Sequence, residues 1–458
     1  MKIAVAGCGK VGSEIAQQLA LEGHAITIID TDSDRIDNIG NQYDLMGVCG
    51  SCTDLATLRE AQVGKADLLI ASTATDELNL LSCIAARKLG AKRTIARVRD
   101  PAYTESESGK SLMDLLAGEL GLSMYINPEY SAATEISRVL RFPSAQHIEV
   151  FAEGRVEIVE LTVSDASPLA GVALKDLQKS FGAHILVCAV LRSDSIIIPD
   201  GGFVLASGDR ISITGNTSEI TRFFRKLGIL RKKADSVLII GGGRIAYYLA
   251  RILRGADTRV TILERDKQVC DRLVELLPDV DIIHGDGIDH ELLGEIGAAD
   301  MDGIAVLTGS DEKNIIIGLY AASLGDGKVI IKVNNGNLIR LGERAGLSSV
   351  ISPKHITANM ILSYVRGMSA TIESGVEAMH SICGGQVEAL EFSVGKDIPG
   401  VCGVPLKDLN TRKQLLLACI IRDGKTVIPG GMDSLRMGDH VIVVTTEIGL
   451  DDITDILK

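Results

Sequence analysis

The stretch from Lys2 to Asp30, KIAVAGCGKVGSEIAQQLALEGHAITIID, passes from a β-branched run through a glycine turn and a helical pattern into a second β-branched run. Gly7, Gly9 and Gly12 give the spacing G-x-G-x-x-G directly after the first run, and Asp30 ends the second. In this context the motif is typical of dinucleotide binding, because the glycines allow a tight turn and close approach of a pyrophosphate. The following helix offers free N–H groups and partial positive charge to the phosphates. The stretch therefore predicts a Rossmann-like α/β domain.

The same pattern recurs in the second half of this 458-residue chain. Gly241 and Glu264, in SVLIIGGGRIAYYLARILRGADTRVTILE (236–264), each lie 234 residues after Gly7 and Asp30. The later segments that also repeat are TATDELN (73–79) with TGSDEKN (308–314), and GVALKDL (171–177) with GVPLKDL (403–409). Repeats in a constant order predict a tandem duplication of one unit.

Each half of the chain is expected to fold in two parts. Short β-branched runs alternating with helical patterns predict a parallel sheet, and the short strands around a single helix-like stretch that follow predict a small α+β lobe. Asn127-Pro128 and Ser352-Pro353 mark the start of a connecting helix in each half of the chain. The expected parts are a Rossmann-like domain at 1–126 with connecting helix 127–145, a lobe at 146–230, a Rossmann-like domain at 235–354 with connecting helix 353–375, and a lobe at 376–458. The runs expected as strands in the first half are Ile3–Val5, Ala25–Ile29, Leu68–Ala71, Thr94–Val98, Glu157–Val163, His184–Leu191, Ser195–Ile198 and Arg210–Thr214.

Composition narrows the classes of function. A net charge of −13 and 3% aromatic residues argue against nucleic-acid binding, which relies on basic surfaces and stacking platforms. No run of apolar residues is long enough to span a membrane, and the glycine loop follows the first methionine directly, so we expect a cytoplasmic protein. Cys49-Gly-Ser-Cys52 lacks a second ligand pair, so no metal site is expected.

Several polar residues flank the expected nucleotide crevices. Asp30 can accept both ribose hydroxyls and would repel a 2′-phosphate, which favours NAD over NADP. Arg97 and Arg99 alternate on one strand and are candidate phosphate clamps, since Arg binds phosphate in a bidentate way. Thr73 ends an apolar strand at the crevice mouth. Asp76 follows the capping residue Thr75, as Asp311 follows Ser310, and a purely structural role is the alternative there.

Catalytic motifs are missing from the sequence. No Tyr-x-x-x-Lys pair and no His-Glu-x-x-His segment occurs. The small lobe expected in each half of the chain is also small for a substrate domain. We therefore expect a nucleotide sensor and no catalytic residues. The alternatives are a soluble NAD-dependent oxidoreductase and a scaffold whose glycine loops bind nothing.

In the order of its motifs the chain resembles the TrkA family, the nucleotide-binding regulatory subunits of Trk potassium uptake systems, which carry paired RCK (regulator of potassium conductance) domains. The segments that carry the resemblance are MKIAVAGCGKVG (1–12), Asp30, TATDELN (73–79), ARVRDPAY (96–103), INPEY (126–130) and the two LKDL segments. The resemblance implies a cytoplasmic protein, peripheral on the inner face of the membrane. It implies a homo-tetrameric ring or dimer of dimers that docks on a TrkH-like potassium-translocating subunit and binds NAD or NADH, or ATP or ADP at one or both sites.

With the family's positions carried over, each half has its own set of expected cofactor-binding residues. In the first half they are Gly7, Cys8, Gly9, Lys10, Val11, Gly12, Asp30, Thr53, Thr73, Ala74 and Arg97. In the second half they are Gly241, Gly242, Gly243, Arg244, Ile245, Glu264, Thr308, Gly309 and Lys332. Ser51 stands where the second half has Asp286, and Ala246 and Lys332 replace Gly12 and Arg97. We therefore expect the second site to be weakened or selective for a different nucleotide.

Overall fold

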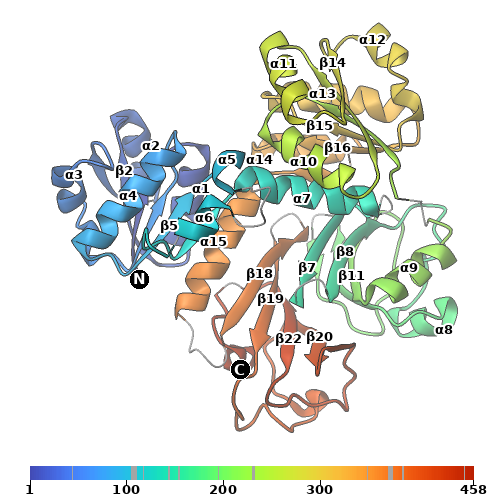
Figure 1. Cartoon of the computed structure of the whole chain (residues 1–458). Helices are drawn as coiled ribbons and strands as arrows, with labels where there is room; N and C mark the ends of the chain where they lie inside the picture. Colours follow the sequence, from blue (N-terminus) through green and yellow to red (C-terminus); the bar gives the residue numbers. More distant parts are fainter. Residues whose placement is uncertain are drawn as a thin grey trace. The chain divides into compact units, whose positions relative to one another are not determined.

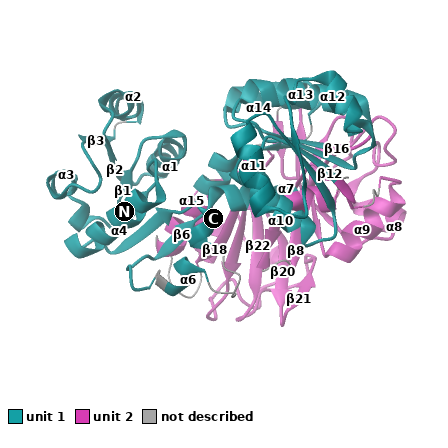
Figure 2. Cartoon of the chain, turned by 45° about the horizontal axis from the view of Figure 1, so that its top comes forward, with its two compact units in different colours: residues 1–136, 237–325, 329–358 teal, residues 137–236, 326–328, 359–458 magenta. Residues whose placement is uncertain are grey.

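The computed structural model describes the chain except for residues 44, 105–110, 117, 143–144, 153–154, 194, 230–232, 348, 370–374, 384–385 and 448. Two compact units emerge, and each takes residues from both halves of the sequence (Figure 2). Unit 1 comprises residues 1–136, 237–325 and 329–358, and unit 2 comprises 137–236, 326–328 and 359–458. The two Rossmann-like parts of the duplicated sequence therefore lie together in unit 1, and the two small lobes lie together in unit 2.

Unit 1 contains two six-stranded parallel sheets, ordered β3-β2-β1-β4-β5-β6 and β14-β13-β12-β15-β16-β17 (Figure 1). The strands of the first sheet are β1 Lys2–Ala6, β2 Ala25–Asp30, β3 Met46–Cys49, β4 Leu68–Ala71, β5 Arg93–Arg97 and β6 Met124–Ile126. Those of the second are β12 Ser236–Ile240, β13 Arg259–Glu264, β14 Asp281–His284, β15 Gly303–Val306, β16 Lys328–Lys332 and β17 Val350–Ile351. The strand order reverses beside β1 and β12, which is where ligands bind in open α/β sheets. The expected fold class is confirmed.

Helices connect these parallel strands. In the first half they are α1 Lys10–Leu21, α2 Ser33–Tyr43, α3 Leu55–Glu60, η1 Val63–Lys65, α4 Asp76–Leu89, α5 Pro101–Thr104 and α6 Leu112–Leu116. In the second half they are α10 Arg244–Arg254, α11 Lys267–Leu276, α12 His290–Glu295, η4 Ala298–Asp300, α13 Asp311–Leu324 and α14 Gly336–Arg344. The helix α1 buries Ile15, Ala16 and Leu19, the apolar positions at helical spacing that seal one face of the sheet.

The helices α7 (Pro128–Arg141) and α15 (Pro353–Ser369) begin at the prolines that mark their starts in the sequence. Oδ1 of Asn127 accepts a hydrogen bond from the backbone N–H of Tyr130 at 2.9 Å, as an N-cap does. Both helices begin in unit 1 and end in unit 2. The ends expected for them, at 145 and 375, and the lobe end at 230 fall on or beside residues outside the described set.

Unit 2 holds two five-stranded sheets, ordered β10-β9-β11-β8-β7 and β18-β19-β22-β20-β21. The elements of the first lobe are β7 His147–Phe151, β8 Val156–Thr162, η3 Leu174–Asp176, α8 Leu177–Phe181, β9 Leu186–Arg192, β10 Ser195–Ile197, β11 Arg210–Gly215 and α9 Thr217–Lys226. Those of the second are β18 Val376–Ile382, β19 Val387–Ser393, η6 Leu406–Asp408, β20 Leu415–Arg422, β21 Lys425–Val427, β22 His440–Thr445 and η7 Ile453–Ile456. One buried cluster draws Phe151, Ile158 and Cys188 from the first lobe and Ile382, Cys419 and Val444 from the second. The two lobes therefore share a core.

The expectation of a single helix-like stretch in each lobe was wrong. The first lobe has both α8 and α9, and in the described part of the second lobe only the short 3-10 turns η6 and η7 are helical. The strands β3, β6 and β7 were also missed. Only Val48 of β3 is buried, and β6 is three residues long at the sheet edge, so neither produces an apolar run.

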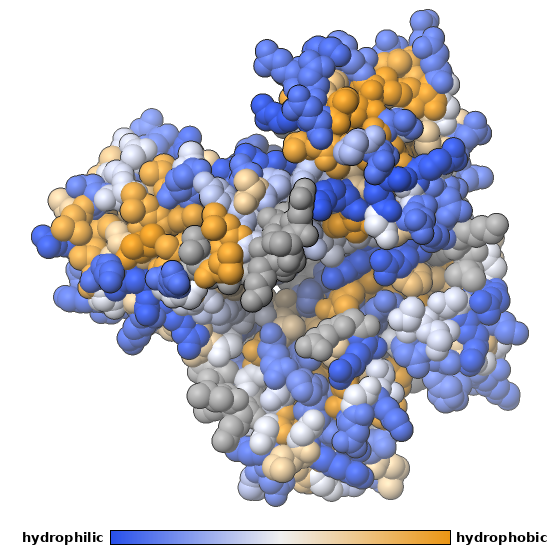
Figure 3. Space-filling view, viewed as in Figure 1, coloured by the Kyte–Doolittle hydropathy of each residue, from blue (hydrophilic) through white to orange (hydrophobic). Residues whose placement is uncertain are grey.

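Within the described part of the chain, no helix combines the length and the apolar character needed to cross a bilayer. Apolar side chains nevertheless reach the surface on two equivalent helices of unit 1, over which Figure 3 shows hydrophobic areas. Leu81 on α4 and Ile316 on α13 are 51% and 61% exposed, and they lie 235 residues apart, as do the repeated segments around them. An exposed apolar patch repeated on both halves is typical of an interaction surface.

Candidate functional site

Both glycine loops follow the first strand of their sheet, and two of the glycines are required by their surroundings. Gly7 has φ 95°, and a Cβ there would lie 2.6 Å from the backbone oxygen of Ser72. A Cβ on Gly12 would lie 1.8 Å from the backbone oxygen of Gly7, so α1 approaches the loop too closely for any side chain. In the second half Ala246 stands at this position. A Cβ on Gly241 would still lie 3.0 Å from Leu307.

Substituting Gly12 by Ala is therefore expected to destabilise the protein by about 2–4 kcal/mol, because backbone must move to relieve the clash. Gly9→Ala is the matched control, since a Cβ there meets nothing within 4 Å. Urea unfolding of the two variants measures the difference. Equal stabilities would contradict the close packing of α1 on the loop.

The two acids at the ends of β2 and β13 are held by their loops in the same way. The carboxylate of Asp30 accepts hydrogen bonds from the backbone N–H groups of Cys8 (2.5 Å) and Asp32 (3.0 Å). Glu264 accepts from Gly242 (2.5 Å) and Asp266 (2.8 Å). Each acid is thus fixed beside the glycine loop, where a ribose would lie if a nucleotide followed the usual path.

The first glycine loop opens onto a cavity of about 520 Å³ within unit 1. The expected residues that line it are Gly7, Gly9, Lys10, Val11, Asp30, Thr73, Ala74 and Arg97, together with Ile245 and Lys332 from the second half. The expected residues that do not line it are Cys8, Gly12, Thr53, Gly241, Gly242, Gly243, Arg244, Glu264, Thr308 and Gly309. The cavity is therefore built from both halves of the chain, which the sequence did not suggest.

Arg99, expected as a candidate phosphate clamp, also lines the cavity. The other lining residues were not expected as site residues, and they are Ile29, Thr31, Arg35, Gly50, Ser51, Cys52, Ser72, Leu78, Pro128, Glu129, Asn334, Pro353 and Lys354. The prolines begin α7 and α15, so both connecting helices present their N-termini to the same cavity. Anions bind at helix N-termini, because the free N–H groups and the helix dipole attract negative charge.

Positive charge dominates the wall of the cavity. The charged lining residues are six cations, Lys10, Arg35, Arg97, Arg99, Lys332 and Lys354, and two acids, Asp30 and Glu129. Burial lowers the pKa of Arg97 and of Lys332 below their ordinary values, with neighbouring cations acting in the same direction. Two desolvated cations in one cavity are unfavourable by themselves, so the wall suits an anionic ligand that would neutralise them.

Not all of these cations are equally available. Arg99 is held by Asp76, whose carboxylate also accepts from the backbone N–H groups of Arg99 and Asp100. Lys354 donates to Glu14 at 2.9 Å. Arg97 lies 3.3 Å from Glu129, and among the described residues Nζ of Lys332 donates only to the backbone oxygen of Leu307, at 3.2 Å. Arg97 and Lys332 are therefore the cations best placed to bind phosphate.

Three cavity-lining side chains carry a buried polar atom that forms no hydrogen bond within the described part of the chain. These atoms are Oγ of Ser72, Nε of Arg97 and Oε2 of Glu129. Buried polar atoms without partners are rare in folded proteins, because each loses its hydrogen bond to water. Their concentration on one cavity wall is the pattern expected where a polar ligand or ordered water completes the site.

Asn79 fixes the strand ends at the cavity mouth. Its Oδ1 accepts from the backbone N–H (2.6 Å) and hydroxyl (2.7 Å) of Thr73, and its Nδ2 donates to the backbone oxygen of Arg97 (2.8 Å). Asn314 joins Thr308 to Lys332 in the same way. The asparagines stand in the repeated TATDELN and TGSDEKN segments, so their recurrence could have indicated this positioning role. Asp76 and Asp311 are likewise structural, binding backbone N–H groups after the next strand.

The two halves of unit 1 meet at reciprocal contacts. Tyr248 on α10 is 1% exposed, accepts from Nδ2 of Asn127 at 2.8 Å and donates to the backbone oxygen of Arg99 at 2.9 Å. Glu14 on α1, 234 residues earlier, contacts Lys354 at the start of α15. Each glycine-loop helix therefore contacts the start of the other half's connecting helix, which brings Lys332 and Lys354 to the first loop.

Comparison with known proteins agrees with this architecture. The family model described as the TrkA-N domain matches residues 3–127 and 237–353, and the TrkA-C domain model matches 158–228 and 390–458. The Trk system potassium uptake protein TrkA homolog of Archaeoglobus fulgidus is 31% identical, with 100% of both chains covered. The Trk system potassium uptake protein TrkA of Halomonas elongata is 30% identical over 97% of this chain and 95% of its own.

Among solved structures, the GsuK channel bound to NAD has a similar fold, with a TM-score of 0.62 over 97% of this chain and 76% of that one at 18% identity. The GsuK channel has also been solved bound to ADP, with a TM-score of 0.50 over 80% of this chain and 69% of that one at 16% identity. Matches of both domain types, in the duplicated order and along the full length of curated relatives, lead to one conclusion. The chain belongs to the TrkA family of potassium uptake proteins.

Proposed function

We propose that this protein is a nucleotide-sensing regulatory subunit of a potassium uptake system, and that the cavity at the first glycine loop is its sensing site. The observation that supports this most directly is the combination of a glycine loop, a fixed ribose acid and two desolvated cations in one cavity. A dinucleotide or an adenine nucleotide supplies the matching ribose and phosphates. The names of the relatives and the family's role in potassium uptake support the regulatory part.

NAD or NADH is the proposed ligand, with ATP or ADP as the alternative at one or both sites. Asp30 favours a free ribose 2′-hydroxyl, which all four nucleotides carry, and disfavours NADP. The GsuK neighbour was solved with NAD and, separately, with ADP, so this fold accommodates both kinds of ligand. The second loop keeps Glu264 but has Ala246 and Lys332 where the first has Gly12 and Arg97, so we propose a different affinity there.

Occupancy would be transmitted through the connecting helices. Pro128 and Glu129 at the start of α7, and Pro353 and Lys354 at the start of α15, line the cavity, and both helices continue into unit 2. A ligand that binds one arrangement of these helix starts more tightly shifts the population toward it. We propose that this shift regulates a TrkH-like membrane partner, on whose cytoplasmic side a homo-oligomeric ring of this chain docks. The equivalent exposed residues Leu81 and Ile316 support such an assembly.

Calorimetric titration of the purified chain with NAD, NADH, ATP and ADP tests the proposal. We expect at least one nucleotide to bind with a Kd well below 1 mM, about −4 kcal/mol. Weaker binding of all four would contradict a sensing site. Incubation with NADH and carbonyl substrates addresses the oxidoreductase alternative, and turnover there would replace the regulatory interpretation.

A further inference from the structure

The second small lobe holds a group of polar side chains that the nucleotide site does not use. Glu377 on β18, Glu391 on β19 and His440 on β22 each offer one ligand atom, and these atoms lie within 4.8 Å of one another. Nδ1 of His440 is 2.9 Å from Oε2 of Glu377 and 3.3 Å from Oε1 of Glu391. Separations of this size are typical of atoms that share one metal ion at about 2.0–2.2 Å.

Local structure directs these side chains toward one another. His440 pairs with Ser393 across the sheet, two positions from Glu391, so His440 and Glu391 lie on one face. The register of β18 against β19 shifts between Val376 and Ala378, which makes Glu377 the extra residue of a β-bulge. Bulges re-aim a side chain at a cost in strand pairing and often occur beside functional sites.

The group holds two carboxylates and one imidazole. Glu391 is 5% exposed, and Nδ1 of His440 is a buried atom that forms no hydrogen bond within the described residues. One imidazole therefore faces two carboxylates, one of them buried. Buried carboxylates need a counter-charge, because water no longer stabilises them.

The first lobe carries an arginine at the position equivalent to His440. There Arg210 takes the place of His440 and Glu160 that of Glu391, as the sheet registers show. The arrangement is otherwise closely alike, since Glu160 accepts from the backbone N–H of Cys383 and Glu391 from that of Ala152, 231 residues earlier. The first lobe thus has a permanently charged arginine at the sequence position where the second lobe has a metal-ligating imidazole.

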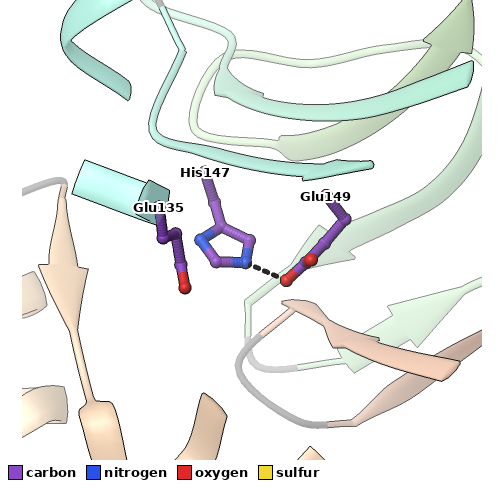
Figure 4. Close-up of side chains that lie close together, drawn as sticks. All are labelled: Glu135, His147 and Glu149. Carbon is purple, nitrogen blue, oxygen red and sulfur yellow. Dashed lines mark hydrogen bonds and ion pairs between the residues drawn. The ribbon is translucent and has the colours of Figure 1, made fainter. Parts of the chain in front are cut away.

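Glu149, a comparable buried carboxylate in unit 2, is already compensated. One of its oxygens lies 2.6 Å from Nε2 of His147, as Figure 4 shows, and the other contacts Nδ1 of His380. Although burial opposes ionisation, His380 and His147 together hold the pKa of Glu149 well below its ordinary value. At Glu149, two imidazoles contact one carboxylate. At His440, two carboxylates contact one imidazole.

We propose that Glu377, Glu391 and His440 bind a divalent transition-metal ion of the zinc type. The imidazole favours such an ion over Mg²⁺ or Ca²⁺, which prefer oxygen ligands throughout. Three protein ligands leave a position for water. The bound ion would also fix Glu391, whose Oε2 accepts from Ala152 of the first lobe at 3.0 Å. Metal occupancy in the second lobe would thereby stabilise its contact with the first.

Calorimetric titration of the chelator-treated, nucleotide-free full chain with ZnCl₂ tests this site. We expect one Zn²⁺ ion to bind per chain and to raise the Tm, since a ligand that binds the folded state stabilises it. Glu377→Gln removes an exposed ligand and should weaken binding at least ~10-fold. His440→Arg introduces the residue that the first lobe carries and should abolish binding while the chain stays folded.

Cys49→Ser is the matched control, because Cys49 is an exposed free thiol that could bind zinc elsewhere. We expect it to leave the titration unchanged. Zinc binding that survives both Glu377→Gln and His440→Arg, that depends on Cys49, or that is absent from the unmodified chain would overturn the proposal. Tighter binding of Mg²⁺ or Ca²⁺ than of Zn²⁺ at this site would overturn the assignment to a transition metal.

Discussion

Replacing both Asp30 and Glu264 by alanine is expected to remove nearly all NAD binding. Each acid is held by two backbone N–H groups beside its glycine loop, and each would accept hydrogen bonds from a ribose. Hydrogen bonds to charged groups contribute about 1.5–3 kcal/mol each, so losing two of them weakens a site about 100-fold or more. Calorimetric titration of the single and double variants measures each contribution.

We expect Asp30→Ala to cause the larger single loss, because Asp30 lines the cavity that contains Arg97 and Lys332. Asp67→Ala is the control, since this carboxylate lies outside the cavity and pairs with the exposed Lys92. Thermal unfolding should show that both variants remain folded. NAD affinity that is unaffected by the double substitution would rule out the assigned ribose acids.

Replacing Lys332 by methionine is expected to weaken nucleotide binding at the first site by about 10- to 100-fold, although Lys332 belongs to the second half. Its ammonium group lies in the first cavity, where burial already lowers its pKa, so a phosphate would gain a poorly solvated charge partner. The experiment requires a Glu264→Ala background, in which the second site is silenced and the remaining titration reports the first.

Lys92→Met in the same background is the control, because Lys92 is a surface cation whose side chain is 74% exposed. Salt should reduce the effect of Lys332 less than that of an exposed cation, since buried charges are poorly screened. If Lys332→Met and Lys92→Met bind nucleotide equally well, the first site does not depend on the second half, and the shared cavity is not the binding site.

The repeat explains why so much could be predicted from the sequence. Gly7, Gly12 and Asp30 lie within one local strand–turn–helix–strand stretch, whose backbone requirements are visible in residue types alone. Arg97 required only the rule that ligands bind at the carboxyl ends of parallel strands. The short edge strands β3 and β6 gave no such signal, because they bury few side chains.

Local sequence therefore determined the two glycine loops, their acids and the duplication itself. Only the tertiary structure decided that Lys332, Asn334 and Lys354 lie beside Lys10 and Arg97, because this depends on how α10 packs against α7 and α1 against α15. The same is true of Glu377, Glu391 and His440, which are separated in sequence and meet through sheet register and a bulge. Contacts between distant residues depend on packing and register, and neither leaves a periodic pattern in the chain.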